Sequence, residues 1–203
     1  MEAWDAPLDG DAPTVGVLAL QGDVLEHLRA LRRVGARPVR VRRPVHLEGL
    51  DGVVLPGGES TTIGKMLVRF DLFDPLRDAI GAGLPAFGTC AGMILLAREL
   101  EQDVEQPVLG VLDVRVRRNA FGRQVDSFDT ALEVAGIAGG PVDVSFIRAP
   151  WVERVLAEDV EVLAAVGEHP VVVRQGHVLA ASFHPEVTGD DRLHAAWVGG
   201  LRA

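Results

Sequence analysis

One cysteine has the surroundings that nucleophilic catalysis needs. Cys90 is the only cysteine of the 203-residue chain, and it stands at the centre of a Gly-Thr-Cys-Ala-Gly pattern over residues 88–92, between a short apolar run and the apolar run 93–97. An apolar strand, a tight glycine turn and a helix make up a nucleophile elbow, in which a Cβ at either glycine position would crowd the turn. A helix N-terminus also favours a thiolate. We therefore predict Cys90 as a nucleophile; the alternative is a buried structural cysteine.

A nucleophilic thiol needs a base, and the base needs a group that orients it. Among six histidines, His184 stands out because Glu186 lies two residues further on, across Pro185. Pro185 disfavours helical backbone at His184, and residues i and i+2 of an extended chain share a face. Glu186 is then expected to accept the Nδ1 hydrogen and leave Nε2 for Cys90. The alternative is a solvated surface loop. No histidine pair has metal-binding spacing, so no metal site is predicted.

A glycine pair occupies the loop that follows a third predicted strand. Residues 56–62 read Pro-Gly-Gly-Glu-Ser-Thr-Thr directly after the apolar run 52–55. Ligand sites of open α/β sheets gather at the carboxyl ends of strands. The backbone N–H groups of Gly58 and of Ala91, the residue after the nucleophile, are the predicted oxyanion hole. The spacing does not fit a phosphate loop; the remaining alternative is an ordinary turn whose hydroxyl residues cap the next helix.

Three arginines lie close together over residues 117–123, beside Gly122. A solvated face is the usual explanation of such a cluster. The sharper hypothesis is that one guanidinium holds a substrate carboxylate through two parallel hydrogen bonds.

The order of apolar runs predicts the elements that must hold these residues. Strands without alternation of polar and apolar residues are typical of a sheet covered on both faces, so we expect a three-layer α/β fold with a mostly parallel open sheet. Three late strands joined by glycine turns predict an antiparallel extension. Predicted strands are 15–20, 38–41, 52–55, a short strand between Gly83 and Cys90, 109–116, 128–134, 142–147, 160–166, 171–175 and 178–181; predicted helices are 24–34, 63–70, 75–80, 93–97 and 190–198; residues 99–107 are predicted as a loop.

Composition limits the class of protein. The 48% of hydrophobic residues suffices for one packed domain, predicted over residues 14–203 after a disordered tail, 1–13. The net charge of −9 argues against a nucleic-acid partner. No apolar stretch approaches the ~20 residues of a membrane span, and one cysteine suits a reducing compartment, so a cytoplasmic location is expected.

Six segments together carry a resemblance to a known family. The chain resembles the class I (triad) glutamine amidotransferases, most closely the glutaminase subunits of pyridoxal 5′-phosphate synthases. The Gly-x-Cys-x-Gly and His-Pro-Glu elements are shared by all class I glutaminases, whereas the segments Gly-Gly-Glu-Ser-Thr-Thr and Arg-Asn-x-Phe-Gly-Arg-Gln are specific to the subfamily. The matching segments run in family order and cover residues 16–22, 55–62, 87–92, 118–128, 146–150 and 182–186.

The resemblance implies a flavodoxin-like fold and a role for each matched residue. Cys90 attacks the carboxamide of L-glutamine, His184 moves the proton and Glu186 orients His184. The residues expected to bind glutamine are Gly58, Glu59, Ser60, Arg118, Ile147 and Arg148. No cofactor or metal is implied.

The resemblance also implies a partner. The ammonia passes to a (β/α)8-barrel synthase subunit in a large hetero-oligomer, which builds pyridoxal 5′-phosphate from ribose 5-phosphate, glyceraldehyde 3-phosphate and ammonia. Glutaminase activity is expected to be low until that subunit docks near Gln21 and Gly22. Two rivals remain: a glutaminase that feeds a different synthase, and a flavodoxin-like redox-sensing module in which Cys90 is oxidised.

Overall fold

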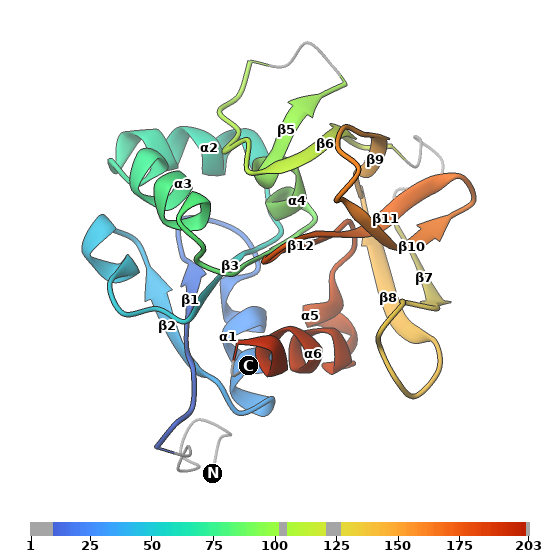
Figure 1. Cartoon of the computed structure of the whole chain (residues 1–203), viewed down its shortest axis with the longest axis horizontal. Coiled ribbons are helices and arrows are strands. Elements are labelled where there is room, and N and C mark those ends of the chain that lie inside the picture. Colours follow the sequence, from blue (N-terminus) through green and yellow to red (C-terminus); the bar gives the residue numbers. More distant parts are fainter. Residues whose placement is uncertain (1–9, 102–104, 121–126, 202–203) are drawn as a thin grey trace.

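A seven-stranded sheet lies at the centre of the molecule, in the strand order β10-β11-β12-β4-β3-β1-β2 (Figure 1). The structure is a computed structural model that describes residues 10–101, 105–120 and 127–201. Strands β2, β1, β3, β4 and β12 are parallel, and β10 and β11 extend the sheet in antiparallel fashion. The predicted fold class is therefore confirmed. The strands of this sheet are β1 Thr14–Leu18, β2 Arg37–Val41, β3 Gly52–Leu55, β4 Ala86–Thr89, β10 Glu161–Val166, β11 His169–Gln175 and β12 Val178–Ala181.

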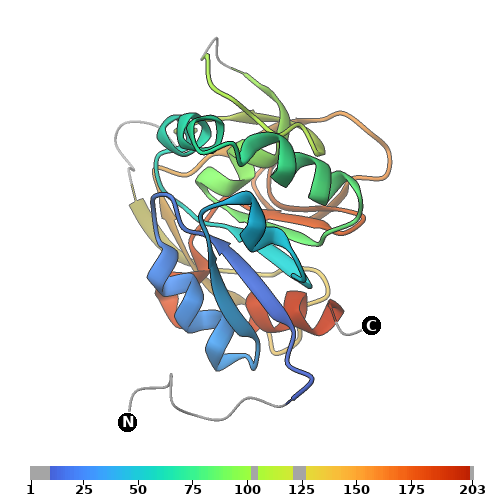
Figure 2. The ribbon, with the colours of Figure 1, turned by 90° about the vertical axis from the view of Figure 1, so that its left-hand side faces the viewer.

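Helices cover both faces of this sheet, as the quarter-turned view also shows (Figure 2). On one face lie α2 Ser60–Arg69, α3 Phe73–Gly81 and α4 Ala91–Leu96; on the other lie α1 Val24–Arg33, α5 Pro185–Thr188 and α6 Arg192–Gly200. Each face has its own apolar core. Strands β3, β4 and β12 are buried along their whole length, which explains their unbroken apolar sequences.

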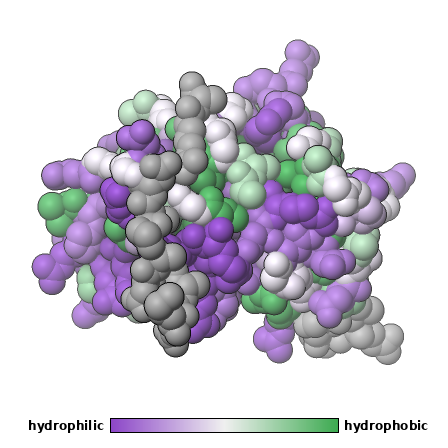
Figure 3. Space-filling view, turned by 90° about the horizontal axis from the view of Figure 1, so that it is seen from below, coloured by the Kyte–Doolittle hydropathy of each residue, from purple (hydrophilic) through white to green (hydrophobic). Residues whose placement is uncertain are grey.

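Two small sheets and a short 3-10 helix complete the described fold. Strands β5 Ala97–Leu100, β6 Leu112–Arg117 and β9 Trp151–Val155 form one sheet, and β7 Ser127–Leu132 and β8 Val142–Ile147 form the other. The 3-10 helix η1 spans Pro44–Leu47. Seen from below, the surface is largely hydrophilic, with hydrophobic residues in a few small groups (Figure 3). None of the helices within the described ranges has the length and apolar character that a membrane crossing requires.

Four sequence predictions need correction. The predicted loop 99–107 begins too early, because Ala97–Leu100 is strand β5, in which Glu99 pairs with Arg115 of β6. Strand β9 and the one-turn helix α5 were not predicted. The predicted tail is too long: Ala12 is buried, and the Pro13 carbonyl accepts the Arg37 N–H at 2.8 Å. The rest of that tail, 1–9, lies outside the described residues, as do residues 121–126 of the predicted arginine segment.

Candidate active site

Cys90 lies in a tight turn between β4 and α4, as the glycine pattern predicted. Its backbone has φ 46° and ψ −102°, a conformation that a residue with a Cβ rarely adopts. A Cβ on Gly88 would lie 2.8 Å from the Gly92 carbonyl oxygen, and a Cβ on Gly92 would collide with the Leu55 carbonyl oxygen. The Cys90 N–H donates to the Ala181 carbonyl at 2.8 Å, so the end of β12 holds the elbow. Strained backbone of this kind concentrates at functional sites.

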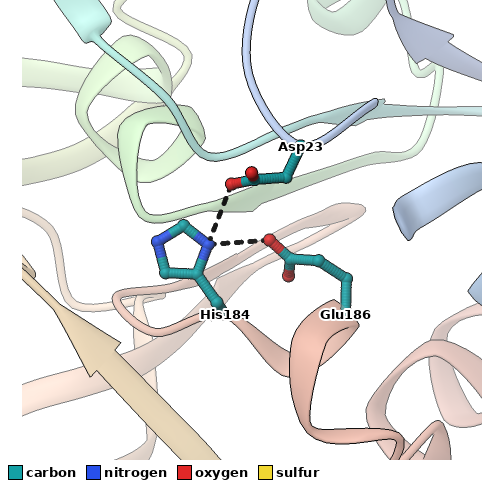
Figure 4. A group of neighbouring side chains, drawn as sticks. All are labelled: Asp23, His184 and Glu186. Atoms are coloured by element: carbon teal, nitrogen blue, oxygen red, sulfur yellow. Dashed lines mark hydrogen bonds and ion pairs between the residues drawn. The ribbon is translucent and has the colours of Figure 1, made fainter. Parts of the chain in front are cut away.

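His184 lies just beyond β12, beside the strand that leads to Cys90. Its ring is buried, and its Nδ1 lies 2.8 Å from Oε1 of Glu186 (Figure 4). The predicted pairing is therefore present, but the expected reason for it is wrong: Glu186 belongs to the first turn of α5, which Pro185 begins, and not to an extended segment. Proline is favoured at the first position of a helix, because its missing N–H is unpaired there in any case.

The charge of His184 depends on Cys90 as well as on the two acids. Burial opposes a positive charge on His184, but hydrogen bonds with Asp23, Cys90 and Glu186 outweigh it and raise the pKa of His184 to about 12. Burial raises the pKa of Glu186, while its bond to His184 acts in the opposite direction. On its other side, Cys90 Sγ lies 3.9 Å from the carbonyl oxygen of Ile147.

Asp23 is a second acid on the same imidazole nitrogen, and the sequence did not single it out. Its Oδ2 lies 3.2 Å from Nδ1 of His184 (Figure 4). Asp23 sits at the N-terminus of α1, in the loop that leaves β1, yet its side chain makes no capping hydrogen bond. The hydrogen bond to His184 lowers the pKa of Asp23. A signal existed: the aspartate follows the carboxyl end of a parallel strand.

Asp23, His184 and Glu186 also have the donor spacing of a cation site. One ligand atom from each lies within 4.8 Å of the others. The histidine atom involved is Nδ1, which already serves both carboxylates as a hydrogen-bond partner. A cation there would displace both hydrogen bonds, so the arrangement suits the orientation of an imidazole better.

The glycine pair after β3 lies against the histidine. A Cβ on Gly57 would collide with the His184 ring and approach Asp23 Oδ2 to 2.9 Å. Gly58 has φ 147°, and a Cβ on it would lie 2.5 Å from the side-chain oxygen of Gln21. The two glycines therefore allow a close approach of the backbone to the site, as the sequence indicated. The use of the Gly58 and Ala91 N–H groups as an oxyanion hole stays a prediction.

Glu59, Ser60 and Arg118 come together around one further residue, Gln106. Gln106 Oε1 accepts hydrogen bonds from Ser60 Oγ at 3.0 Å and from Arg118 at 3.1 Å. Arg118 also pairs with Glu59 at 3.2 Å. Glu59, and not a hydroxyl residue, caps α2, by accepting the N–H of Thr62 at 2.7 Å. Gln106 lies in the segment predicted as a loop, and no motif there marks this glutamine as a functional residue.

Ile147 is the last residue of strand β8, and Arg148 follows it, beside the nucleophile. The Ile147 carbonyl faces the Cys90 sulfur. The next residue, Arg148, has φ 45°, so its backbone is strained like that of Cys90. Direct contacts thus join Cys90 to Ile147 and His184 to Glu186, and Cys90 is one of the groups that raise the pKa of His184. Glu59, Ser60 and Arg118 form a neighbouring group, which Gln21 links to Gly58 by accepting the Glu59 N–H at 2.8 Å.

Such an arrangement can carry out acyl transfer. A thiol, a base bonded to it and a buried acid on the far nitrogen of the base are the parts that nucleophilic catalysis at a carbonyl or carboxamide needs.

Comparisons with known proteins agree with this chemistry. Residues 17–201 match the family described as the SNO glutamine amidotransferase family. A protein of Frankia casuarinae named pyridoxal 5′-phosphate synthase subunit PdxT is 62% identical over 192 residues, which cover 94% of this chain and 96% of that one. A protein of Streptomyces griseus with the same name is 57% identical over 95% of this chain and 98% of its own.

Solved structures give the same result. The crystal structure of a glutamine amidotransferase superposes with a TM-score of 0.87 at 54% identity, over 93% of this chain and 99% of that one. A glutamine amidotransferase of Thermotoga maritima shares the fold, with a TM-score of 0.60 at 15% identity, over 96% of this chain and 84% of that one. The elbow and the histidine–acid pair agree with these matches, which show that the chain belongs to the SNO glutamine amidotransferase family.

Proposed function

We propose that this chain is the glutaminase subunit of a pyridoxal 5′-phosphate synthase, which hydrolyses L-glutamine to L-glutamate and ammonia. The observation that carries the proposal is the buried hydrogen bond between His184 and Glu186, next to Cys90 at the carboxyl ends of the adjacent strands β4 and β12. It occurs in a chain 62% identical to a protein named as that subunit.

The reaction proceeds in two acyl-transfer steps. The thiol proton already lies on Nε2 of His184, whose pKa is raised to about 12, and the Cys90 thiolate attacks the carboxamide carbon of glutamine. The tetrahedral intermediate places its negative oxygen on the N–H groups of Gly58 and Ala91. When this intermediate collapses, its carbon–nitrogen bond breaks and His184 gives its proton to the leaving nitrogen. Ammonia departs, and the glutamyl group stays on Cys90 as a thioester. Water, deprotonated by His184, then releases glutamate and restores the thiolate.

The acids keep His184 in the orientation that both steps need. Glu186 accepts the Nδ1 hydrogen from a buried position, and Asp23 approaches the same nitrogen from the β1–α1 loop. This fixes the tautomer that presents Nε2 to the sulfur and stabilises the imidazolium that forms.

Two arginines are candidates for the α-carboxylate of glutamine. Arg148 follows the carbonyl that faces Cys90, and no hydrogen bond or ion pair ties its side chain to the described part of the chain. Arg118 is already paired with Glu59 and Gln106. We assign the carboxylate to Arg148, with Arg118 holding Glu59 and Ser60 in place beside Ile147 and Gly58.

The ammonia is used by a synthase partner, a (β/α)8-barrel subunit with which this chain forms a large hetero-oligomer in the cytoplasm. The partner docks near Gln21 and Gly22. Because Gln21 accepts the N–H of Glu59 beside Gly58, contact with this loop can alter the predicted oxyanion hole. Each step above uses only side chains and backbone groups of this chain and needs no cofactor.

The test is ammonia release from glutamine, with and without the synthase subunit of the same organism. We expect stimulation by that subunit, and a loss of at least about 10³-fold in Cys90→Ala. A glutamine-analogue electrophile should add its mass to Cys90, glutamine should protect against it, and His184→Ala should lose the labelling. Unstimulated activity that survives in Cys90→Ala would overturn the proposal.

A further inference from the structure

A buried pair of histidines lies behind the acid of the proposed triad. His27 of α1 and His194 of α6 are both fully buried, and His27 Nδ1 lies 3.0 Å from His194 Nε2. The other nitrogen of His27, Nε2, lies 3.0 Å from Thr89 Oγ1 and 3.5 Å from Glu186 Oε2. His27 therefore touches both the residue that precedes the nucleophile and the acid that orients the base.

The position of each hydrogen follows from the polar atoms that have no partner. Among the described residues, Glu186 Oε2 and His194 Nδ1 are buried atoms without a hydrogen bond. A hydrogen on His194 Nδ1 would be a buried donor without an acceptor, and a lone pair on His27 Nε2 would face the lone pairs of Glu186. The unpaired donor and the facing lone pairs are both avoided if His194 Nε2–H donates to His27 Nδ1 and His27 Nε2–H lies against Thr89 and Glu186, which leaves His194 Nδ1 as an unpaired acceptor.

Both histidines are neutral, which this arrangement requires. Burial lowers the pKa of His27 well below its ordinary value, and burial lowers that of His194 to about 4. The groups that face Glu186 are His184 on Oε1, His27 on Oε2 and the negative charge of Asp23. Those that face His194 are His27 and, at longer range, Asp191 and Arg33.

We propose that His27 is a positioning residue, whose Nε2–H supports the second oxygen of Glu186 and fixes Thr89 beside the nucleophile. Glu186 is buried; its Oε1 pairs with His184, and its Oε2 has no hydrogen bond within the described part of the chain. A second N–H dipole aimed at Oε2 favours the carboxylate over the neutral acid, and a carboxylate is the form that sets the tautomer of His184. The expected effect on kcat rests on the proposed function, whereas the expected hydrogen on Nε2 of His27 does not.

The kinetic test compares variants in the complex with the synthase subunit. Without the N–H, burial raises the pKa of Glu186 further, so the acid limb of the kcat profile moves to higher pH. We expect His27→Leu to shift that limb upward by about one pH unit and to lower kcat about 10- to 30-fold, with KM for glutamine changed less than about twofold. His27→Gln keeps an N–H near the Nε2 position and should recover kcat to within about threefold.

His177→Leu is the matched control, because within the described residues its Nε2 bonds to the Ile80 carbonyl alone, at 2.7 Å, away from the triad; it should leave the profile unchanged. A loss of kcat in His27→Leu without movement of the acid limb, or a Gln variant as impaired as the Leu variant, would overturn the inference.

A second measurement needs no activity. In ¹⁵N-labelled wild-type protein, His27 should show the Nε2–H tautomer and stay neutral between about pH 5 and 8, whereas a histidine of ordinary pKa becomes charged within that range. An Nδ1–H tautomer would overturn the inference even if the glutaminase assay succeeds. An Nε2–H tautomer in a chain without glutaminase activity would instead count against the proposed function alone.

Discussion

Because Glu186 and Asp23 both lie against Nδ1 of His184, we predict that kcat does not depend entirely on either acid. Glu186 is buried and lies 2.8 Å from Nδ1 of His184, whereas the Asp23 side chain is 39% exposed and lies 3.2 Å away. If Glu186 is removed, Asp23 can still accept the Nδ1 hydrogen and keep Nε2 directed at Cys90. We therefore predict that Glu186→Gln and Asp23→Asn are coupled in their effect on kcat.

The expected sizes follow from distance and burial. A hydrogen bond to an ionised group is worth about 1.5–3 kcal/mol when buried, and an exposed ion pair at most about 1 kcal/mol. With Glu186 in place, Asp23→Asn should cost only about threefold in kcat. Loss of the only acid of a triad costs about 10⁴-fold, so Glu186→Gln should cost about 10³-fold, because Asp23 remains. In that background Asp23 is the acid that remains on Nδ1, so Asp23→Asn should cost the rest of the ~10⁴-fold loss, a further tenfold or so.

The assay is single-turnover release of ammonia by the four proteins, each in complex with the synthase subunit. Asp71→Asn is the control, since Asp71 is exposed in a turn with φ 54°, where asparagine is well tolerated. The helix is not weakened by Asp23→Asn, because Asp23 makes no capping hydrogen bond. If Asp23→Asn lowers kcat by the same factor with and without Glu186, the two acids are independent and the reasoning fails.

Three further predictions test other parts of the site. In Gly57→Ala the new Cβ collides with the His184 ring, so kcat should fall at least about 10²-fold at unchanged thermal stability; Gly199→Ala, where nothing lies within 4 Å, should keep full activity. His194 has its pKa lowered to about 4, so the stability that it contributes is present above pH 6.5 and is lost as pH falls from 6.5 towards 4, by up to about 1.4 kcal/mol per pH unit. Denaturant melts of His194→Phe should therefore depend less on pH in that window. Gln106→Leu removes the acceptor shared by three donors and should raise KM for glutamine about tenfold with kcat nearly unchanged, as initial rates over a range of glutamine concentrations would show.

The inner strands of the central sheet were predictable because they are buried along their whole length. Strands β3, β4 and β12 read as unbroken apolar runs, and the glycines around Cys90 have a steric purpose that is visible in the sequence. Strand β9 was missed because Trp151–Val155 contains two charged residues on an edge and is only partly buried. Its apolar pattern is therefore too weak to predict a strand.

The sequence predicted the site residues that belong to a short motif and missed those that do not. His184 and Glu186 lie two residues apart, so their pairing was visible, although the helix turn that produces it was not. Asp23, Gln106 and His27 each act through a contact with a residue at least 12 positions away in the chain. A lone aspartate, glutamine or histidine has no local pattern, and only the packing of distant elements brings such residues to the site.

Strand β12 runs directly beside β4, so the thiol and the imidazole stand at the tips of adjacent parallel strands. Their separation is thus set by one inter-strand spacing of about 4.8 Å and by the bond from Cys90 N–H to Ala181, whatever the chain does in between. The intervening stretch, which includes both small sheets, makes a long detour away from this pair of strands. Insertions or deletions in turns of this stretch that lie away from Arg118, Ile147 and Arg148 can reshape the surface that meets other molecules, while the reacting pair keeps its geometry.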